Sequence, residues 1–329
     1  MSQPSAERIF SVSDTAGFEK LALEIFRFQA AGCPVYREYI SLLGIDPGKV
    51  ESLSGIPFMP ISFFRDHTVM TGDGPAGKIF LSSGTTGMRQ SRHNVREPAI
   101  YDESLEKTFR IFYGDPSEYA VAGLLPSYME REGSSLIYMV DRLMHLSGNS
   151  AGGFFLDDHD ALFNAIDKAR ADGLKVLLIG VTFALLDLAE KFPQDLSDVI
   201  VMETGGMKGR RREMIREEVH EILKNAFGVK AVHSEYGMTE LLSQAYSQGK
   251  GLFRTPPWMK VLIRDSHDPM SHTSATGAAG GISVIDLANL WSCSFIATSD
   301  LGRMHDGGQF EVQGRFDEAD IRGCNLLVS

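Results

Sequence analysis

The feature that most constrains the fold is an alternation of short apolar runs with longer helical patterns, which extends from about residue 79 to about residue 250. The runs are apolar or β-branched and occupy residues 78–81, 120–125, 153–156, 176–181, 199–202 and 229–233. Because strands that alternate with helices are joined by right-handed crossovers, this pattern predicts a largely parallel, doubly wound α/β sheet. Ligands of such sheets bind at the carboxyl ends of the strands. The segments that follow these runs are therefore the first candidates for a functional site.

The segments on either side differ from this core. Residues 1–78 contain two helical patterns and then the stretch IPFMPISFFRDH, which we expect to be extended because Pro57 and Pro60 oppose a regular central element. Residues 251–329 hold short apolar runs separated by Gly, Asp and His, which is typical of a small antiparallel β unit. We therefore predict an N-terminal helical and extended segment (1–78), an α/β core (79–250) and a small β-rich subdomain (251–329).

Composition excludes several classes of protein. Of the 329 residues, 43% are hydrophobic and 23% are charged, so the chain can bury a core that offsets its ordering entropy. The net charge of −11 disfavours nucleic acid and anionic membranes as partners, because both require a basic face. The longest apolar stretch, residues 176–186, is too short for a membrane span. Three scattered cysteines and an N-terminus without an apolar leader favour a cytoplasmic protein with no nucleic-acid partner and no membrane insertion.

The strongest functional motif, LSSGTTGMRQSR, directly follows the first run of the core. Its hydroxyl residues and glycines are Ser82, Ser83, Gly84, Thr85, Thr86 and Gly87. Glycines let backbone N–H groups turn toward a ligand and hydroxyls donate to anionic oxygens, a combination that suits a polyphosphate. Arg89 and Arg92 could supply positive charge, and no Gly-Lys-[Ser/Thr] follows, so the loop is not a Walker A motif. A polar surface turn is the alternative interpretation.

A second motif, SEYGMTE, follows the last run of the core. Tyr236 offers a flat face for a purine and Gly237 a close backbone turn. Thr239 adds a hydroxyl, and Glu240 adds a hard oxygen ligand suited to Mg²⁺. The alternative is a helix N-terminus at which Thr239 and Glu240 are capping residues.

Three weaker candidates complete the set. In ETGGMKGRR, the pair Gly205 and Gly206 can pass close to a planar ring, although an ordinary strand-to-helix turn explains it as well. In ATSDLGRM, Asp300 follows an apolar run, and a carboxylate can accept two hydrogen bonds from a ribose diol. Arg315, in GRFDEADIRGC, can support the same ribose. Taken singly, Asp300 and Arg315 are more often turn residues than ligands.

Taken together and in this order, the five motifs resemble those of the adenylate-forming superfamily, which includes acyl-CoA synthetases, luciferases and adenylation domains. The segment FEKLALEIFRFQAAGCPVYREYI, together with IPFMPISFFRDH and the ending RGCNLLVS, more narrowly resembles the LuxE-type acyl-protein synthetases. The motifs run from residue 81 to residue 323, so the resemblance covers most of the chain. It implies an adenylate-forming N-terminal domain of α/β class, with a mostly parallel sheet and a small β-rich C-terminal subdomain.

The resemblance implies an acid–thiol ligase that uses ATP and Mg²⁺. A fatty carboxylic acid would be activated to an acyl adenylate with release of pyrophosphate, and the acyl group would pass to an enzyme cysteine. The loop from Ser82 to Gly87 would hold the β- and γ-phosphates, Thr239 the α-phosphate and Glu240 the Mg²⁺. The remaining nucleotide contacts implied by the motifs are Tyr236 and Gly205 to adenine, with Gly206 and Gly237 beside them, and Asp300 and Arg315 to the ribose.

Cys324 resembles the acyl-accepting cysteine that LuxE-type synthetases carry near the C-terminus. Arg322 stands two positions before it and favours the thiolate, so Cys324 is the preferred nucleophile over Cys33 and Cys293. A buried, inert cysteine is the alternative interpretation.

Two departures from the superfamily pattern affect the chemistry. Gln90 stands where many members carry lysine, so either Arg89 or Arg92 substitutes for that lysine or the charge is missing. The sequence ends fifteen residues after Gly314, whereas many members continue into a mobile domain with a catalytic lysine. We therefore expect either Lys208 or an arginine to stabilise the developing charge, unless adenylation is slow or lost.

Two other functions stay open. An acyl-CoA or carrier-protein ligase, of the phenylacetate-CoA ligase kind, would share the activation step. A non-catalytic nucleotide-binding subunit would keep the site without turnover. The favoured partners are a small-molecule carboxylic acid and a fatty-acid reductase that receives the acyl group, and homo-oligomer formation is left open.

Overall fold

The computed structural model describes residues 4–83, 89–125, 133–156, 158–205, 214–265 and 267–316. The chain divides into two compact units. Unit 1 comprises residues 1–79, 87–98 and 254–329, and unit 2 comprises residues 80–86 and 99–253. The first and last of the three segments distinguished in the sequence therefore lie together in unit 1. A separate two-stranded ladder is formed by β2 (Lys78–Leu81) and β3 (Arg92–Val95).

Unit 2 is built around a sheet in the order β5-β4-β6-β7-β8-β9. Its strands are β4 (Tyr119–Leu124), β5 (Gly153–Phe154), β6 (Lys175–Gly180), β7 (Val199–Glu203), β8 (His233–Tyr236) and β9 (Ala245–Ser247), and β10 (Leu252–Phe253) follows them in the chain. All neighbouring pairs from β5 to β8 are parallel, whereas β9 is antiparallel to β8. Because β5 and β6 lie on opposite sides of β4, the strand order reverses there, as in a doubly wound sheet.

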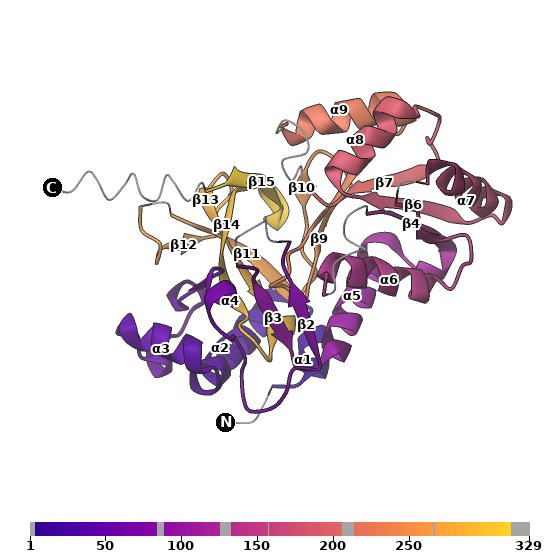
Figure 1. Cartoon of the computed structure of the whole chain (residues 1–329). Helices are drawn as coiled ribbons and strands as arrows, with labels where there is room; N and C mark the ends of the chain where they lie inside the picture. Colours follow the sequence, from indigo (N-terminus) through magenta and orange to yellow (C-terminus); the bar gives the residue numbers. More distant parts are fainter. Residues whose placement is uncertain are drawn as a thin grey trace. The chain divides into compact units, whose positions relative to one another are not determined.

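Helices cover both faces of this sheet. They are α5 (Pro98–Tyr113), α6 (Ser135–Ser147), α7 (His159–Ala171), α8 (Thr182–Lys191) and α9 (Arg216–Phe227). In Figure 1, α8 and α9 lie above the strands and α5 and α6 lie below them. All six residues of β4 are buried, as expected for a central parallel strand that is covered on both faces.

Local sequence signals explain where these helices begin and end. Ser134 caps α6 and Asp158 caps α7, each by accepting a hydrogen bond from a backbone N–H in the first turn. α6 ends at Gly148 and α9 at Gly228, both with φ of 68°, a left-handed conformation that favours glycine. Within the described ranges, none of the helices combines the length and the apolar character that crossing a bilayer requires.

Unit 1 contains a second sheet, in which β15, β14, β13, β11 and β12 follow one another in antiparallel pairs. These strands are β11 (Met259–Arg264), β12 (His272–Thr273), β13 (Ala279–Asp286), β14 (Phe295–Met304) and β15 (Phe310–Arg315). One short strand from the beginning of the chain, β1 (Met59–Pro60), pairs in parallel with β14. The predicted antiparallel unit near the C-terminus is thus confirmed, and it incorporates an N-terminal segment.

The N-terminal helices complete unit 1. They are α1 (Ala6–Phe10), α2 (Thr15–Gly32), α3 (Pro34–Leu42) and α4 (Phe63–Asp66). Gln29 of α2 donates to the carbonyl oxygens of Asn289 and Leu290 at 2.9 and 3.0 Å. Its amide oxygen accepts from the Ser294 backbone N–H at 2.9 Å. Gln29 therefore joins α2, one of the indigo helices of Figure 1, to the segment between β13 and β14, and both ends of its buried amide are satisfied.

Three expectations from the sequence need correction. A mostly parallel sheet is not confirmed for the chain as a whole, because the sheet of unit 1 is antiparallel. The strand expected at 229–233 is β8, which begins at His233. Val229 and Val232 are buried without pairing, since an apolar run marks burial rather than a ladder. The stretch IPFMPISFFRDH is not extended throughout, because α4 follows β1 and buries Phe64.

Candidate functional site

The carboxyl ends of β7 and β8 bring two of the sequence motifs together. Glu203, the last residue of β7, pairs with Ser234 of β8 in the parallel ladder. The turn containing Gly205 follows β7, and residues 236–240 lie at the end of β8 and immediately after it. Both segments therefore lie at the same edge of one parallel sheet, where doubly wound sheets bind their ligands.

The Gly205 turn has a backbone that requires glycine. Gly205 has φ of 75°, in the left-handed region, and its carbonyl oxygen accepts from the Thr182 N–H at 3.3 Å. The neighbouring Thr204 N–H donates to the Gly180 carbonyl at 3.0 Å. No described atom lies within 4 Å of the position that a Cβ at Gly205 would occupy. A Cβ at Gly205 would therefore meet no described residue, while Gly206 lies outside the described residues.

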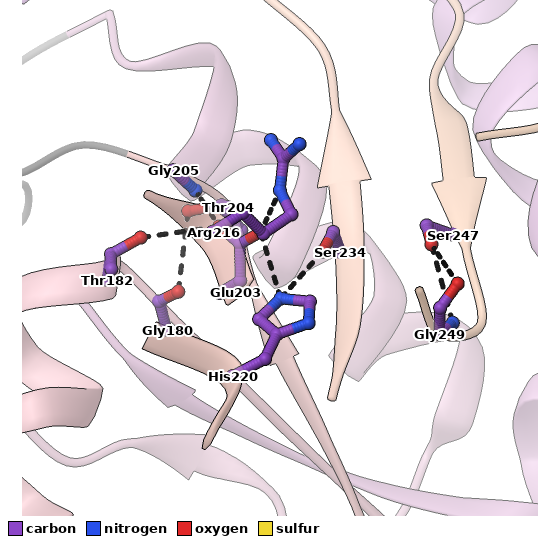
Figure 2. Close-up of polar contacts among 10 residues, drawn as sticks. All are labelled: Gly180, Thr182, Glu203, Thr204, Gly205, Arg216, His220, Ser234, Ser247 and Gly249. Atoms are coloured by element: carbon purple, nitrogen blue, oxygen red, sulfur yellow. Dashed lines mark hydrogen bonds and ion pairs between the residues drawn. The ribbon is translucent and has the colours of Figure 1, made fainter. Parts of the chain in front are cut away.

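A buried carboxylate supports this turn (Figure 2). Oε2 of Glu203 accepts from the Gly205 N–H at 2.6 Å and from the Thr182 hydroxyl at 3.3 Å. Oε1 accepts from Arg216 Nε at 3.3 Å and lies 3.7 Å from His220 Nε2. Ser234 Oγ lies 3.4 Å from the same imidazole nitrogen. The Glu203 carboxylate thus joins the turn after β7 to the first turns of α9.

Two neighbouring carboxyl groups at this edge have opposite protonation behaviour. Burial by itself raises the pKa of Glu203, but the hydrogen bond from His220 and the charge of Arg216 outweigh it and lower that pKa to about 2. Desolvation and the negative charge of Glu203 raise the pKa of Glu235 to about 8. At neutral pH, Glu203 is therefore ionised and Glu235 carries a proton, because two adjacent carboxylates seldom ionise together.

The segment after β8 is shaped by its glycine. Tyr236 is 8% exposed, and its ring lies 5.8 Å from that of Phe253. A Cβ at Gly237 would collide with the Glu235 carboxyl group, so this position accepts no larger residue without rearrangement. Glu240 is 5% exposed, whereas Thr239 is half-buried. A buried carboxylate and a more accessible hydroxyl thus follow one close turn.

His233, at the start of β8, contacts aromatic residues. Its Nδ1 lies 3.2 Å from the Tyr113 hydroxyl, and burial and the charge of His220 lower its pKa. His233 is therefore a neutral, half-buried imidazole near neutral pH.

The structure describes only part of the predicted phosphate loop. Ser82 and Ser83 directly follow β2, with Ser82 half-buried and Ser83 exposed. Arg89 and Arg92 are exposed, and Arg92 opens β3. The loop residues Gly84, Thr85, Thr86 and Gly87 lie outside the described residues, as does Lys208.

The predicted ribose pair is formed in unit 1. Asp300 of β14 lies opposite Arg315 of β15 in the antiparallel ladder. The Asp300 side chain is 7% exposed and that of Arg315 is 76% exposed. A buried carboxylate is thus held by a guanidinium that reaches solvent.

Of the three cysteines, Cys324 lies outside the described residues. Cys33 and Cys293 are free thiols with no exposed surface. Burial raises the pKa of Cys33, and burial together with the neighbouring Cys33 raises that of Cys293 well above its ordinary value. These two thiols are therefore protonated and shielded, as structural cysteines are.

The sequence motifs did not identify Glu203, Arg216 and His220 as members of this site. One signal was present, because Glu203 places a charge directly between the apolar run 199–202 and the glycine pair. Arg216 and His220 face the same carboxylate because they stand four residues apart on one side of α9. Nothing in their sequence neighbourhood names a partner on β7.

No protein-family profile matches the chain. Among curated proteins, the chain is 22% identical to the long-chain-fatty-acid–luciferin-component ligase of Vibrio harveyi over 320 residues. The match covers 89% of this chain and 82% of that protein. The resemblance to LuxE-type acyl-protein synthetases is thus confirmed by a relative matched over most of both chains.

Solved structures share the fold. ATP-bound MatB from Rhodopseudomonas palustris matches with a TM-score of 0.54 at 16% identity, over 74% of this chain and 49% of that one. The luciferase-like enzyme of the nonluminescent mealworm Zophobas morio matches with a TM-score of 0.53 at 16% identity, over 75% of this chain and 60% of that one. The chain spans about half the length of these structures. At such identities the likeness shows the shared fold alone.

Proposed function

We propose that this protein uses ATP to activate a fatty carboxylic acid as an acyl adenylate and then transfers the acyl group to its own Cys324. The observation that carries the proposal is the position of Gly205 and residues 236–240 at the ends of two paired parallel strands. Base and phosphate groups of one nucleotide can reach both segments there. The name of the Vibrio harveyi relative describes ligation of a long-chain fatty acid, which supports the choice of acid.

The phosphates of ATP would be held by hydroxyls and backbone N–H groups. We assign the β- and γ-phosphates to the loop from Ser82 to Gly87 and the α-phosphate to Thr239. Glu240 would hold Mg²⁺ together with phosphate oxygens. Mg²⁺ commonly takes one or two carboxylates with substrate phosphates, and the described residues include no cluster of three or more His, Cys, Asp or Glu side chains fit for a metal.

The adenosine part would meet different residues. We assign the adenine to the Gly205–Gly206 pair and to Tyr236 with Gly237; the left-handed turn at Gly205, where an added Cβ would meet no described residue, supports the assignment. The ribose diol would be accepted by the Asp300 carboxylate, which Arg315 orients. An ionised carboxylate suits this role, because it accepts hydrogen bonds from both hydroxyls.

The chemistry proceeds in two displacements. A carboxylate oxygen of the acid attacks the α-phosphorus of ATP, and the bond from that phosphorus to the α,β-bridging oxygen breaks to release pyrophosphate. The Cys324 thiolate then attacks the acyl carbon, and the carbon–oxygen bond to AMP breaks. Arg89 or Arg92 would stabilise the charge that develops in the first step. A partner reductase would then accept the acyl group from the thioester.

The decisive experiment combines an acid screen with pyrophosphate exchange and hydroxylamine trapping. Exchange that depends on a fatty acid, with a hydroxamate of that acid as product, supports the proposal. ATP binding without exchange for any acid would instead indicate a nucleotide-binding subunit. A thioester that forms only when CoA is supplied would indicate a CoA ligase.

A further inference from the structure

Glu203 stands two residues before Gly205, at the end of β7, and β7 pairs with β8, which ends at Tyr236. The Glu203 side chain is 5% exposed, so its carboxylate is almost fully withdrawn from water. One oxygen accepts the Gly205 N–H at 2.6 Å, and the other accepts from Arg216 Nε at 3.3 Å (Figure 2). The Glu203 carboxylate therefore holds both the turn after β7 and the side chain of Arg216.

Arg216 continues this connection toward Tyr236. Its guanidinium carbon lies 5.1 Å from the centroid of the Phe253 ring, within the range of cation–π attraction. The Phe253 ring in turn lies 5.8 Å from the ring of Tyr236. We call Glu203, Arg216 and Phe253 the Glu203 brace. It connects Gly205 on one side with Tyr236 on the other.

Stability alone does not explain a charge at this position. Burying a carboxylate costs several kcal/mol before its partners compensate, and a well-packed apolar residue often stabilises a fold equally well. An apolar residue, however, accepts no hydrogen bond from Gly205. The two oxygens of the Glu203 carboxylate accept from different donors, Oε2 from the Gly205 N–H and the Thr182 hydroxyl and Oε1 from Arg216 Nε. His220 Nε2 lies 3.7 Å from Oε1.

We propose that Glu203 is a positioning residue for adenine, which holds the Gly205 turn open and, through Arg216 and Phe253, keeps Tyr236 in place. This inference rests on the proposed function, because it takes the adenine to lie beside Gly205 and Tyr236. A turn fixed before the ligand arrives does not lose conformational freedom on binding, so the brace favours nucleotides that use the base contact. Ligands that carry only phosphates gain nothing from it.

The test compares ligands with and without a base. Dissociation constants of Mg·ATP and of Mg·tripolyphosphate are measured by calorimetry for the wild type and for Glu203→Gln, which keeps the shape but removes the charge. Glu221→Gln is the matched control, because Glu221 is an exposed carboxylate on the same helix as Arg216. We expect Glu203→Gln to weaken ATP binding about 10-fold or more, the scale for one lost charged hydrogen bond. Tripolyphosphate binding should stay within about twofold in all three proteins.

Two further variants keep the test decisive if Glu203→Gln does not fold. Arg216→Lys retains the charge but loses the planar guanidinium, and it should weaken ATP more than tripolyphosphate. Glu203→Asp retains the carboxylate and should restore part of the ATP affinity. Equal losses for both ligands, or unchanged ATP affinity in a folded Glu203→Gln protein, would overturn the positioning role. A wild type that binds neither ligand would instead overturn the proposed function itself.

Discussion

Arg315 donates from Nε to Oδ1 of Asp300 at 2.9 Å, across two neighbouring antiparallel strands. The pair is asymmetric, because Asp300 is buried while most of the Arg315 side chain is in water. Ion pairs with such an exposed member add about 1 kcal/mol or less to stability. This ion pair therefore contributes little to stability, and the ribose contact that we propose for Asp300 is a separate question.

Replacement of Asp300 tests the ribose assignment. Asp300→Ala should weaken ATP and AMP by the same factor, about 10-fold or more, because the ribose is common to both nucleotides. Calorimetric titration of each nucleotide measures this. Asp306→Ala, which removes an exposed carboxylate from the same unit, should leave both affinities unchanged. A loss for ATP alone would contradict the assignment.

The exposed arginines of the phosphate loop should act in adenylation. Gln90 stands where many members of the superfamily carry lysine. If Arg89 or Arg92 takes over the role of that lysine, Arg89→Ala or Arg92→Ala should slow pyrophosphate exchange by about 10²-fold, the scale for losing a preorganised charge. Exchange rates at saturating ATP and acid measure the effect. Arg37→Ala, an exposed arginine on α3, serves as the control. Normal exchange in both single variants and in the double variant would refute the role.

The covalent step should involve one cysteine. With ATP, Mg²⁺ and a labelled acid, but without CoA or reductase, a label that neutral hydroxylamine removes should accumulate on Cys324. Cys324→Ser should abolish it and leave pyrophosphate exchange within about twofold, because the thiol acts only after adenylation. Peptide mapping should find no label on Cys33 or Cys293, which are shielded from solvent. A hydroxylamine-labile label on Cys33 or Cys293 would show that this residue, and not Cys324, is the nucleophile.

The protonated Glu235 should give a distinctive pH dependence of stability. The folded side chain holds its proton to a pKa of about 8, whereas the unfolded one releases it near 4.5. The folded state therefore binds more protons between these values, and its stability falls as pH rises through this window. Urea unfolding measures this effect. Between about pH 5 and about pH 8.5, the titration of Glu235 should lower the free energy of unfolding of the wild type by at least about 1 kcal/mol.

Glu235→Gln removes the titrating proton and should flatten that dependence, so the variant gains stability relative to the wild type at the higher pH. The exposed Glu221→Gln serves as the control and should retain the wild-type slope. Identical slopes for all three proteins would show that Glu235 titrates normally.

Local pattern accounts for the part of the fold that was predicted correctly. The runs expected at 120–125, 153–156, 176–181 and 199–202 coincide within two residues with β4, β5, β6 and β7, because a short apolar run is a local signal of a buried strand. Gly205 was singled out in the sequence only as one of a glycine pair that can pass close to a planar ring; its left-handed backbone is seen in the structure. β8 was misplaced because buried apolar residues precede it without pairing.

Sequence patterns located most of the strands and helices and the motifs that follow the strands, because each of these depends on neighbours within a few residues. Which distant groups meet depends instead on how the elements pack in three dimensions. Gln29 satisfies backbone groups about 260 residues away, and the Glu203 carboxylate meets Arg216 and His220 of α9. The reason is physical: periodicity specifies which face of an element is buried, whereas the partner of a buried polar group depends on how all the elements pack.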